Sequence, residues 1–296
     1  MLEFRDIDIS DKMRIDAALS ESQFMGCEYS FANNMAWRRL AGSQISFYKN
    51  FYLCCAFDTE DGVPRFILPA GTGSYKDVIG EMKRYTDSLG VPLIITGITD
   101  DFLPMLHELY PNGFIVTYDR DSSDYIYNTS DLIELPGKKY HGKRNYLARF
   151  KELGCEYSPI TEKDFDDCIT FGAVSYNSRA AEHDHSFIAE QFAINTYFTY
   201  FYELGLSGGV IRKDGELAAF TIGEKLNRDT FCIHIEKADT KYSGIYAGIN
   251  NCFAKDAARS YKFINREEDL GLEGLRKSKL SYRPAFILNK NIVTFK

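Results

Sequence analysis

The pattern of apolar and polar residues predicts similar sets of secondary-structure elements in the two halves of the chain. Each half contains two apolar runs separated by an Asp-Gly dipeptide: 51–57 and 65–70 around Asp61-Gly62, and 208–212 and 217–223 around Asp214-Gly215. Such a dipeptide is a strong hairpin signal, because glycine readily adopts the positive φ that tight turns need. We therefore predict one β-hairpin in each half.

The segments after the two hairpins also correspond. Apolar spacing predicts a long helix, a buried strand, a short helix and a last strand in each half: 75–88, 91–98, 102–110 and 114–118, then 245–258, 261–265, 270–279 and 284–288. In the second half, helices at 162–173 and 186–204 precede the hairpin, and an additional strand at 230–237 follows it. This order is that of the acetyltransferase-like GNAT fold. We predict two tandem α/β (α+β) domains whose mixed central sheets are flanked by helices.

The dipeptide Pro136-Gly137 separates the two sets of elements. A chain of 296 residues suits two domains, and the 22 Phe and 20 Tyr give each half enough bulk for its own core. We expect an N-terminal domain at 1–137 and a C-terminal domain at 138–296. The first carries a net charge of −10 and the second +3, so an anionic ligand should bind to the second.

The sequence gives no sign of export or membrane insertion. No uncharged apolar run approaches the roughly 18–20 residues of a spanning helix, and the N-terminus does not have the pattern of a signal peptide. The seven cysteines include no CxxC pair, which suits a reduced compartment. We expect a cytoplasmic protein without a transmembrane segment. Peripheral contact with a membrane is compatible with this expectation.

Several classes of site have no support in the sequence. GxSxG, GxGxxG and GxxxxGK[ST] are all absent, which removes the usual hydrolase, Rossmann and P-loop signatures. The run His183-Asp184-His185 offers metal ligands, but no spacing suggests a third one, and a loop or helix cap explains it as well. We expect no metal site and no tightly bound cofactor.

The strand at 230–237 carries the strongest candidate site. Strict alternation would put Cys232, His234 and Glu236 on one face and apolar residues on the other. Ionisable groups on a central strand are costly to bury unless they are paired or used in chemistry. Either a structural His–Glu pair or an acid–base site explains them.

Two basic segments are candidates for binding phosphate. Six Lys and Arg residues and no acid occur within 138–151, where a helix start would add free N–H groups. Within 265–284, a strand ends at Asn265, and further on four cations lie within eight residues: Arg276, Lys277, Lys279 and Arg283. A solvated interdomain helix and an ordinary mixed-charge helix are the alternatives.

Five stretches carry a resemblance to a known family. They are CEYSFANNMAWR (27–38), GKKYHGKRNYLARF (137–150), FTIGEKLNRDTFCIHIEKAD (220–239), YSGIYAGINNCFA (242–254) and NREEDLGLEGLRKSKLSYRP (265–284). Together they resemble the C-terminal domain of phosphatidylglycerol lysyltransferases. The likeness spans nearly the whole chain, and the last motif is long enough to be specific. It implies a tandem GNAT fold related to the Fem-type aminoacyltransferases.

The resemblance also implies chemistry: transfer of an aminoacyl group from aminoacyl-tRNA to a hydroxyl or amine acceptor, which is a lipid in the membrane-bound members. The transmembrane part of those members is missing here, which leaves the acceptor open. By resemblance, the catalytic candidates are His234, Glu236, Asp269 and Lys279, with Glu236 or Asp269 as base. The substrate-binding candidates are Lys139, His141, Lys143, Arg144, Lys237, Asn265, Arg276 and Arg283.

Two other functions compete with this one. A coenzyme-A-dependent N-acyltransferase would use acyl-CoA as donor, although the stretch 243–248 has a tyrosine where a glycine-rich pyrophosphate loop needs room. A non-catalytic binding protein of the same fold is the third hypothesis.

Overall fold

The computed structural model describes residues 2–177 and 185–296, which form two compact units. Unit 1 comprises Met1–Asp124, Glu268–Gly271 and Leu288–Lys296, and unit 2 comprises Tyr125–Glu267 and Leu272–Ile287. The division is not a single cut in the sequence, because most of the last strand belongs to unit 1. The predicted boundary between the domains 1–137 and 138–296 stays a prediction.

Unit 1 is a mixed sheet with helices. Its strands lie in the order β1 (Ser43–Tyr48), β2 (Phe51–Ala56), β3 (Arg65–Ile67), β5 (Ile94–Thr99), β12 (Phe286–Phe295) and the first part of β6 (Phe114–Asn128), and β4 (Ala70–Gly71) pairs with β2. The helices are α1 (Lys12–Ser22), α2 (Phe31–Trp37), α3 (Tyr75–Leu89) and α4 (Leu103–Leu109), with 3-10 turns η1 (Ile9–Asp11) and η2 (Cys27–Tyr29). Strands β3 and β5 are parallel, and α3 connects them with Val78, Ile79 and Met82 fully buried.

Unit 2 is also a mixed sheet. The end of β6 is followed in the sheet by β11 (Phe263–Asn265), β10 (Thr230–Ala238), β9 (Glu216–Lys225), β8 (Ser207–Lys213) and β7 (Glu156–Pro159). Only the β10–β11 pair among these is parallel. The helices are α5 (Thr129–Glu134), α6 (His141–Glu152), α7 (Phe165–Asn177), α8 (His185–Thr199), α9 (Phe201–Leu204), α10 (Ile245–Asp256) and α11 (Glu273–Leu280), with 3-10 turns η3 (Lys138–Tyr140) and η4 (Glu162–Asp164).

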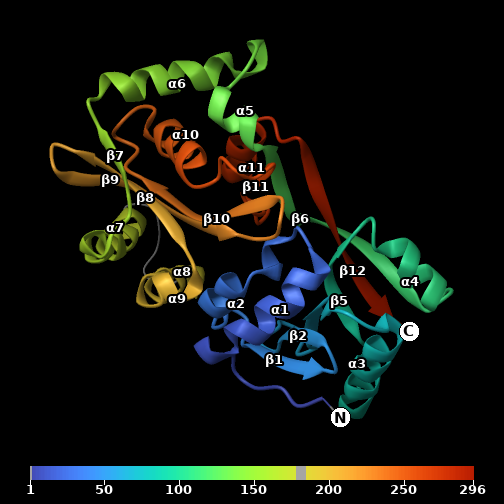
Figure 1. Ribbon diagram of the computed structural model, residues 1–296. Helices are drawn as coiled ribbons and strands as arrows, with labels where there is room; N and C mark the ends of the chain where they lie inside the picture. Colours follow the sequence, from blue (N-terminus) through green and yellow to red (C-terminus); the bar gives the residue numbers. More distant parts are fainter. Residues whose placement is uncertain (1, 178–184) are drawn as a thin grey trace. The chain divides into compact units, whose positions relative to one another are not determined.

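Helices cover both faces of the unit 2 sheet. Figure 1 shows α6 and α10 on one face and α7, α8 and α9 on the other. Phe231 and Ile233 of β10 pack with Phe253 of α10, and Ala238 at the end of the same strand packs with Ile249 of α10. These contacts identify which β10 side chains face α10.

Most of the elements predicted from apolar spacing are present. Asp214 and Gly215 have φ values of 52° and 87° in the tight β8–β9 turn, as the hairpin signal requires. The ends differ more: β6 runs on to Asn128, and the last strand begins at Phe286 and runs to Phe295. Both strands contain buried polar residues, such as Asp124 in β6 and Asn291 in β12. These residues interrupt the apolar pattern, so the pattern did not predict the full length of either strand.

Over the described residues, no helix has the length and apolar character needed to cross a membrane.

Candidate functional site

The parallel strands β10 and β11 share only a short stretch of pairing. Their last pair is Cys232 with Asn265. The chain after β11 then stays with β6, since Arg266 N donates to Tyr125 O and Tyr125 N donates to Glu267 O, both at 3.1 Å. Strand β10 continues to Ala238, and beyond Cys232 no described strand pairs with this edge. The two parallel strands therefore part in the middle of unit 2.

A β-bulge lies on β10 at the same level. The register against β9 shifts between Ile233 and Ile235. As a result Glu236, like Ala238, faces α10, whereas the His234 ring stacks on Tyr197 of α8 at 5.5 Å. Strict alternation, which placed His234 and Glu236 on one face, is wrong here, because the bulge inserts one residue into the alternation.

Glu236 is held by polar partners on the α10 face. It accepts from Arg266 Nη2 at 2.9 Å and from Asn250 Nδ2 at 3.2 Å. The Glu236 and Arg266 side chains are each 11% exposed. Arg266 Nη1 and Asn250 Oδ1 are buried and have no hydrogen-bond partner among the described residues. A buried donor and a buried acceptor left open beside a carboxylate indicate a place for a polar ligand group.

Two lysines converge on Arg266. Lys279 Nζ, on α11, donates to the Arg266 carbonyl oxygen at 2.6 Å. Lys143 Nζ, on α6, lies 3.6 Å from the centre of the Tyr282 ring, and the Arg266 guanidinium lies 4.9 Å from the same ring. Burial, and then the charge of Arg266, lowers the pKa of Lys143 to about 8, against the opposing pull of Glu236. Glu236 thus contacts the Arg266 guanidinium, Lys279 contacts the Arg266 backbone, and Lys143 shares the Tyr282 ring with the guanidinium.

His234 belongs to a separate network on the α8 face. Its Nε2 is 3.1 Å from Glu224 Oε1 and its Nδ1 is 2.8 Å from Glu267 Oε1. Cys232 Sγ lies 3.7 Å from Nδ1. Burial lowers the pKa of His234, but Tyr197, Cys232 and the hydrogen bond to Glu224 more than reverse this, so the pKa is raised well above its ordinary value. The site favours a positive charge at this position.

The remaining substrate-binding candidates are spread over unit 2. Arg144 donates to the carbonyls of Leu135 and Gly137, which fixes the turn before α6. Lys237 pairs with Glu190 at 2.7 Å. The others are placed as follows: Lys139 near Asp131, His141 beside Asn145, Asn265 buried at the end of β11, Arg276 half-buried on α11 and Arg283 exposed after it.

Asp269 lies in unit 1. It is fully buried, accepts from Gly271 N at 3.0 Å and is 3.3 Å from Arg120 Nη1. Its assignment to the same reaction as Glu236 stays a prediction. His183, Asp184 and the side chain of His185 lie outside the described residues.

Unit 1 contains its own buried ion cluster, built on the N-terminal signature stretch. Lys290 Nζ is 2.8 Å from Asp124 and 2.7 Å from Glu28, and Cys27 N donates to Asp124 at 2.8 Å. Burial raises the pKa of Glu28. Lys290 already supplies the cation that these carboxylates need, so the cluster serves the fold of unit 1.

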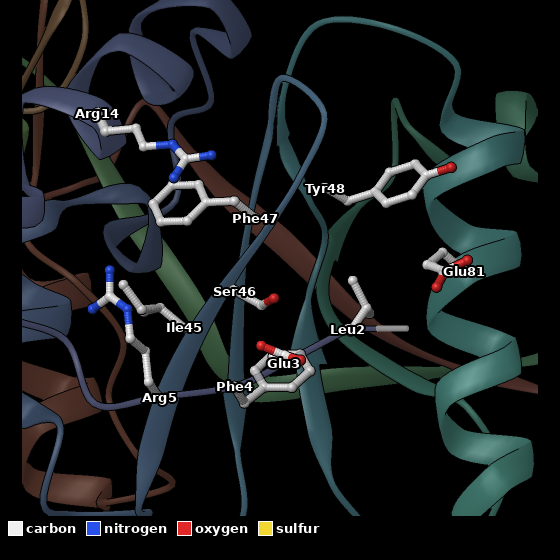
Figure 2. Close-up of a pocket in the computed structure, with 10 residues that line it drawn as sticks. All are labelled: Leu2, Glu3, Phe4, Arg5, Arg14, Ile45, Ser46, Phe47, Tyr48 and Glu81. Carbon is white, nitrogen blue, oxygen red and sulfur yellow. The ribbon is translucent and has the colours of Figure 1, made fainter.

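A pocket of about 470 Å³ in unit 1 is shown in Figure 2. Its two arginines are occupied, because Arg5 pairs with Asp11 and Arg14 lies 3.6 Å from the Phe47 ring. None of its lining residues belongs to the β10–β11 site. The polar networks of unit 2 are therefore the stronger candidate.

Sequence reasoning missed several members of these networks: Arg266, Asn250, Glu224, Glu267, Tyr197 and Tyr282. One signal was available, since Arg266 and Glu267 directly follow a short buried strand, where parallel sheets place their functional groups. Asn250 and Tyr282 lie within the family stretches, but no spacing in the sequence relates them to β10, because only tertiary packing brings them to this strand.

Comparison with known proteins gives a family match over nearly the whole chain. The family described as "Phosphatidylglycerol lysyltransferase, C-terminal" matches residues 20–293. No curated protein sequence gives a significant match. A crystal structure of a conserved protein of unknown function from Bacteroides thetaiotaomicron VPI-5482 is 36% identical, with full coverage of both chains and a TM-score of 0.94.

More distant structures share the fold. L-PGS from Bacillus licheniformis is 16% identical, with 97% of this chain and 92% of that chain covered and a TM-score of 0.68. FemX is 8% identical, with 99% and 97% covered and a TM-score of 0.67. A tandem GNAT protein also aligns along the chain, which confirms the predicted tandem GNAT fold with its relation to Fem-type proteins.

Proposed function

Because the chain belongs to the phosphatidylglycerol lysyltransferase C-terminal family, whose fold relatives support a transferase of acyl or aminoacyl groups, we propose that it moves an aminoacyl group from aminoacyl-tRNA to a hydroxyl or amine acceptor. The active site that we propose is the α10 face of β10, around Glu236 and Arg266.

One observation carries this proposal. The parallel strands β10 and β11 part after Cys232 and Asn265, and a carboxylate of β10 there meets an arginine with an open donor. A lysine of lowered pKa lies over the same Tyr282 ring as this arginine. Backbone N–H groups on the edge of β10 beyond Cys232 can polarise an acyl carbonyl. An activated ester needs mainly a polarised carbonyl, correct orientation and a proton acceptor.

Lys143 is the best matched proton acceptor. A pKa of about 8 leaves a fraction of the amine neutral near physiological pH, as general base catalysis requires. The acceptor's oxygen or nitrogen attacks the ester carbonyl carbon, and its proton passes to Lys143. As the ester C–O bond breaks, Lys143 returns this proton to the departing tRNA oxygen, which leaves as a hydroxyl. Glu236 fixes Arg266, whose free N–H can bind a substrate oxygen.

The loop before α10 bears on the choice of donor. Gly244 begins this helix at φ 93°, and a Cβ there would come within 2.2 Å of Tyr146 O on α6. The glycine therefore serves the packing of α6 on α10. It is therefore not separate support for a pyrophosphate loop.

The decisive experiment compares the two donors on the same protein. Radiolabelled aminoacyl-tRNAs are incubated with the protein and a panel of hydroxyl and amine acceptors, and calorimetry with acetyl-CoA is run in parallel. We expect tRNA binding that weakens steeply as salt rises, because phosphate contacts release counterions. Binding of acetyl-CoA without tRNA binding at low salt would replace the proposal with an N-acyltransferase.

Variants separate a catalyst from a binding protein. Glu236→Gln should abolish transfer while leaving tRNA binding within a few-fold, and Glu216→Gln, an exposed position on β9, is the matched control. Unchanged transfer in Glu236→Gln would move the active site elsewhere. Ligand binding with no turnover for any acceptor would support a non-catalytic protein.

A further inference from the structure

The network on the α8 face contains three side chains of the types that bind zinc. Cys232 Sγ, His234 Nδ1 and Glu267 Oε1 lie within 4.8 Å of one another. Two come from β10 and one from the chain that leaves β11, so they meet where the two parallel strands part. We propose that Cys232, His234 and Glu267 bind a divalent cation of the zinc type, an inference that goes beyond the proposed transferase function.

The spacing of the three atoms supports this. Tetrahedral zinc with ordinary Zn–S, Zn–N and Zn–O bonds separates its ligand atoms by about 3.4–3.6 Å. The sulfur lies 3.7 Å from Nδ1 and 3.9 Å from Oε1. The Nδ1–Oε1 distance of 2.8 Å would open by about 0.6 Å to admit the ion. Side-chain torsions of a glutamate can supply this change.

The residues around His234 hold its ring in the orientation that a metal ligand needs. The second ring nitrogen of His234 lies 3.1 Å from Glu224, as in the carboxylate–histidine–metal arrangement that orients a ligating imidazole. The His234 ring is further fixed by stacking on Tyr197. Both groups hold Nδ1 toward Cys232 and Glu267.

The backbone also places Glu267 at some cost. It has φ 58°, a left-handed conformation that non-glycine residues adopt reluctantly, and Asn265 Oδ1 accepts its N–H at 2.6 Å. Three protein ligands leave a fourth position on tetrahedral zinc. The metal would connect β10 to the chain after β11 at the opening between the strands.

The unit 1 cluster of Cys27, Asp124 and Glu268 has similar residue types but a different character. Lys290 Nζ lies 2.8 Å from Asp124 and 3.6 Å from Cys27 Sγ, so an ammonium group already occupies the position of the cation. This cluster supplies the matched control.

The test uses cobalt(II) as a spectroscopic probe and zinc as competitor. The purified protein is stripped with chelator and titrated with Co²⁺, then with Zn²⁺. We expect about one ion per chain, tetrahedral d–d bands and a thiolate-to-cobalt charge-transfer band, all removed by zinc. Cys232→Ser should lose the charge-transfer band, and Cys27→Ser should keep it.

Two further variants guard against misfolding. Glu224→Gln keeps all three ligands but removes the charge of the carboxylate that orients the His234 ring, so it should weaken affinity by about 10–100-fold. His234→Gln should abolish tight binding, with circular dichroism confirming the fold. Absence of a charge-transfer band in the unmodified protein, or its survival in Cys232→Ser, would overturn the proposal and leave a proton-bridged His234. Aminoacyl transfer is assayed separately, so either proposal can fail alone.

Discussion

The Glu236 carboxylate on β10 lies 2.9 Å from the guanidinium of Arg266, the first residue after β11. The two strands have stopped pairing by this level, and this ion pair joins them across the opening. The ion pair is largely buried, and each charged group stabilises the charge of the other in a region that water hardly reaches. Removing one partner should therefore cost more than removing both.

Arg266→Met should destabilise unit 2 strongly, because among the described residues Glu236 then keeps Asn250 alone as a side-chain partner. We expect a loss of about 3 kcal/mol in the free energy of unfolding, typical for breaking a buried pair. The double variant Glu236→Gln/Arg266→Met should recover part of this loss in chemical denaturation. A loss in the double variant equal to the sum of the losses in Arg266→Met and Glu236→Gln would show that the two charges act independently.

Lys143→Met should lower the rate of aminoacyl transfer by about 10²–10⁴-fold, the usual contribution of a general base. Lys151→Met, an exposed change on the same helix, is the control and should leave the rate unchanged. The pH profile gives the sharper readout: the unmodified protein should gain activity as pH rises toward about 8, where Lys143 loses its proton. A profile that keeps this limb in Lys143→Met would assign the base elsewhere.

The amine of Lys143 should react with acylating reagents at lower pH than an ordinary lysine. Its pKa is lowered to about 8, first by burial and then by Arg266, so half of it is neutral at that pH. Lys241 provides the contrast, because its hydrogen bond to Asp239 raises its pKa. Competitive labelling followed by mass spectrometry measures both midpoints in one sample. Equal midpoints would contradict the burial of Lys143.

Two helix glycines should respond to alanine in opposite directions. At Gly248 in α10, a Cβ would lie 2.5 Å from the Phe150 ring, so Gly248→Ala should cost about 1–3 kcal/mol by overpacking. At Gly80 in α3 a Cβ would meet nothing within 4 Å, so Gly80→Ala should add about 0.5–1 kcal/mol through helix propensity. Denaturant unfolding measures both, and a stabilised Gly248→Ala would show that α6 can move away from α10.

Most helices and strands could be predicted from the sequence, because the signals for them are local. The Asp214-Gly215 turn, the buried face of α3 and the repeated order of elements depend on residues close together in the chain, and the structure contains all of them. Glu236 and Lys279 were predicted as site residues because charge on a central strand is costly to bury and family motifs include both; their roles stay predictions.

Only the tertiary structure decided which of these charged side chains lie next to one another. A bulge between Ile233 and Ile235 turned His234 and Glu236 to opposite faces, and helix packing brought Lys143, Asn250 and Tyr282 to the site from distant segments. No spacing rule encodes such a meeting, because strand register and helix packing depend on the whole core. The sequence therefore determined the elements and the family, and the folded chain determined the chemical neighbours of Arg266.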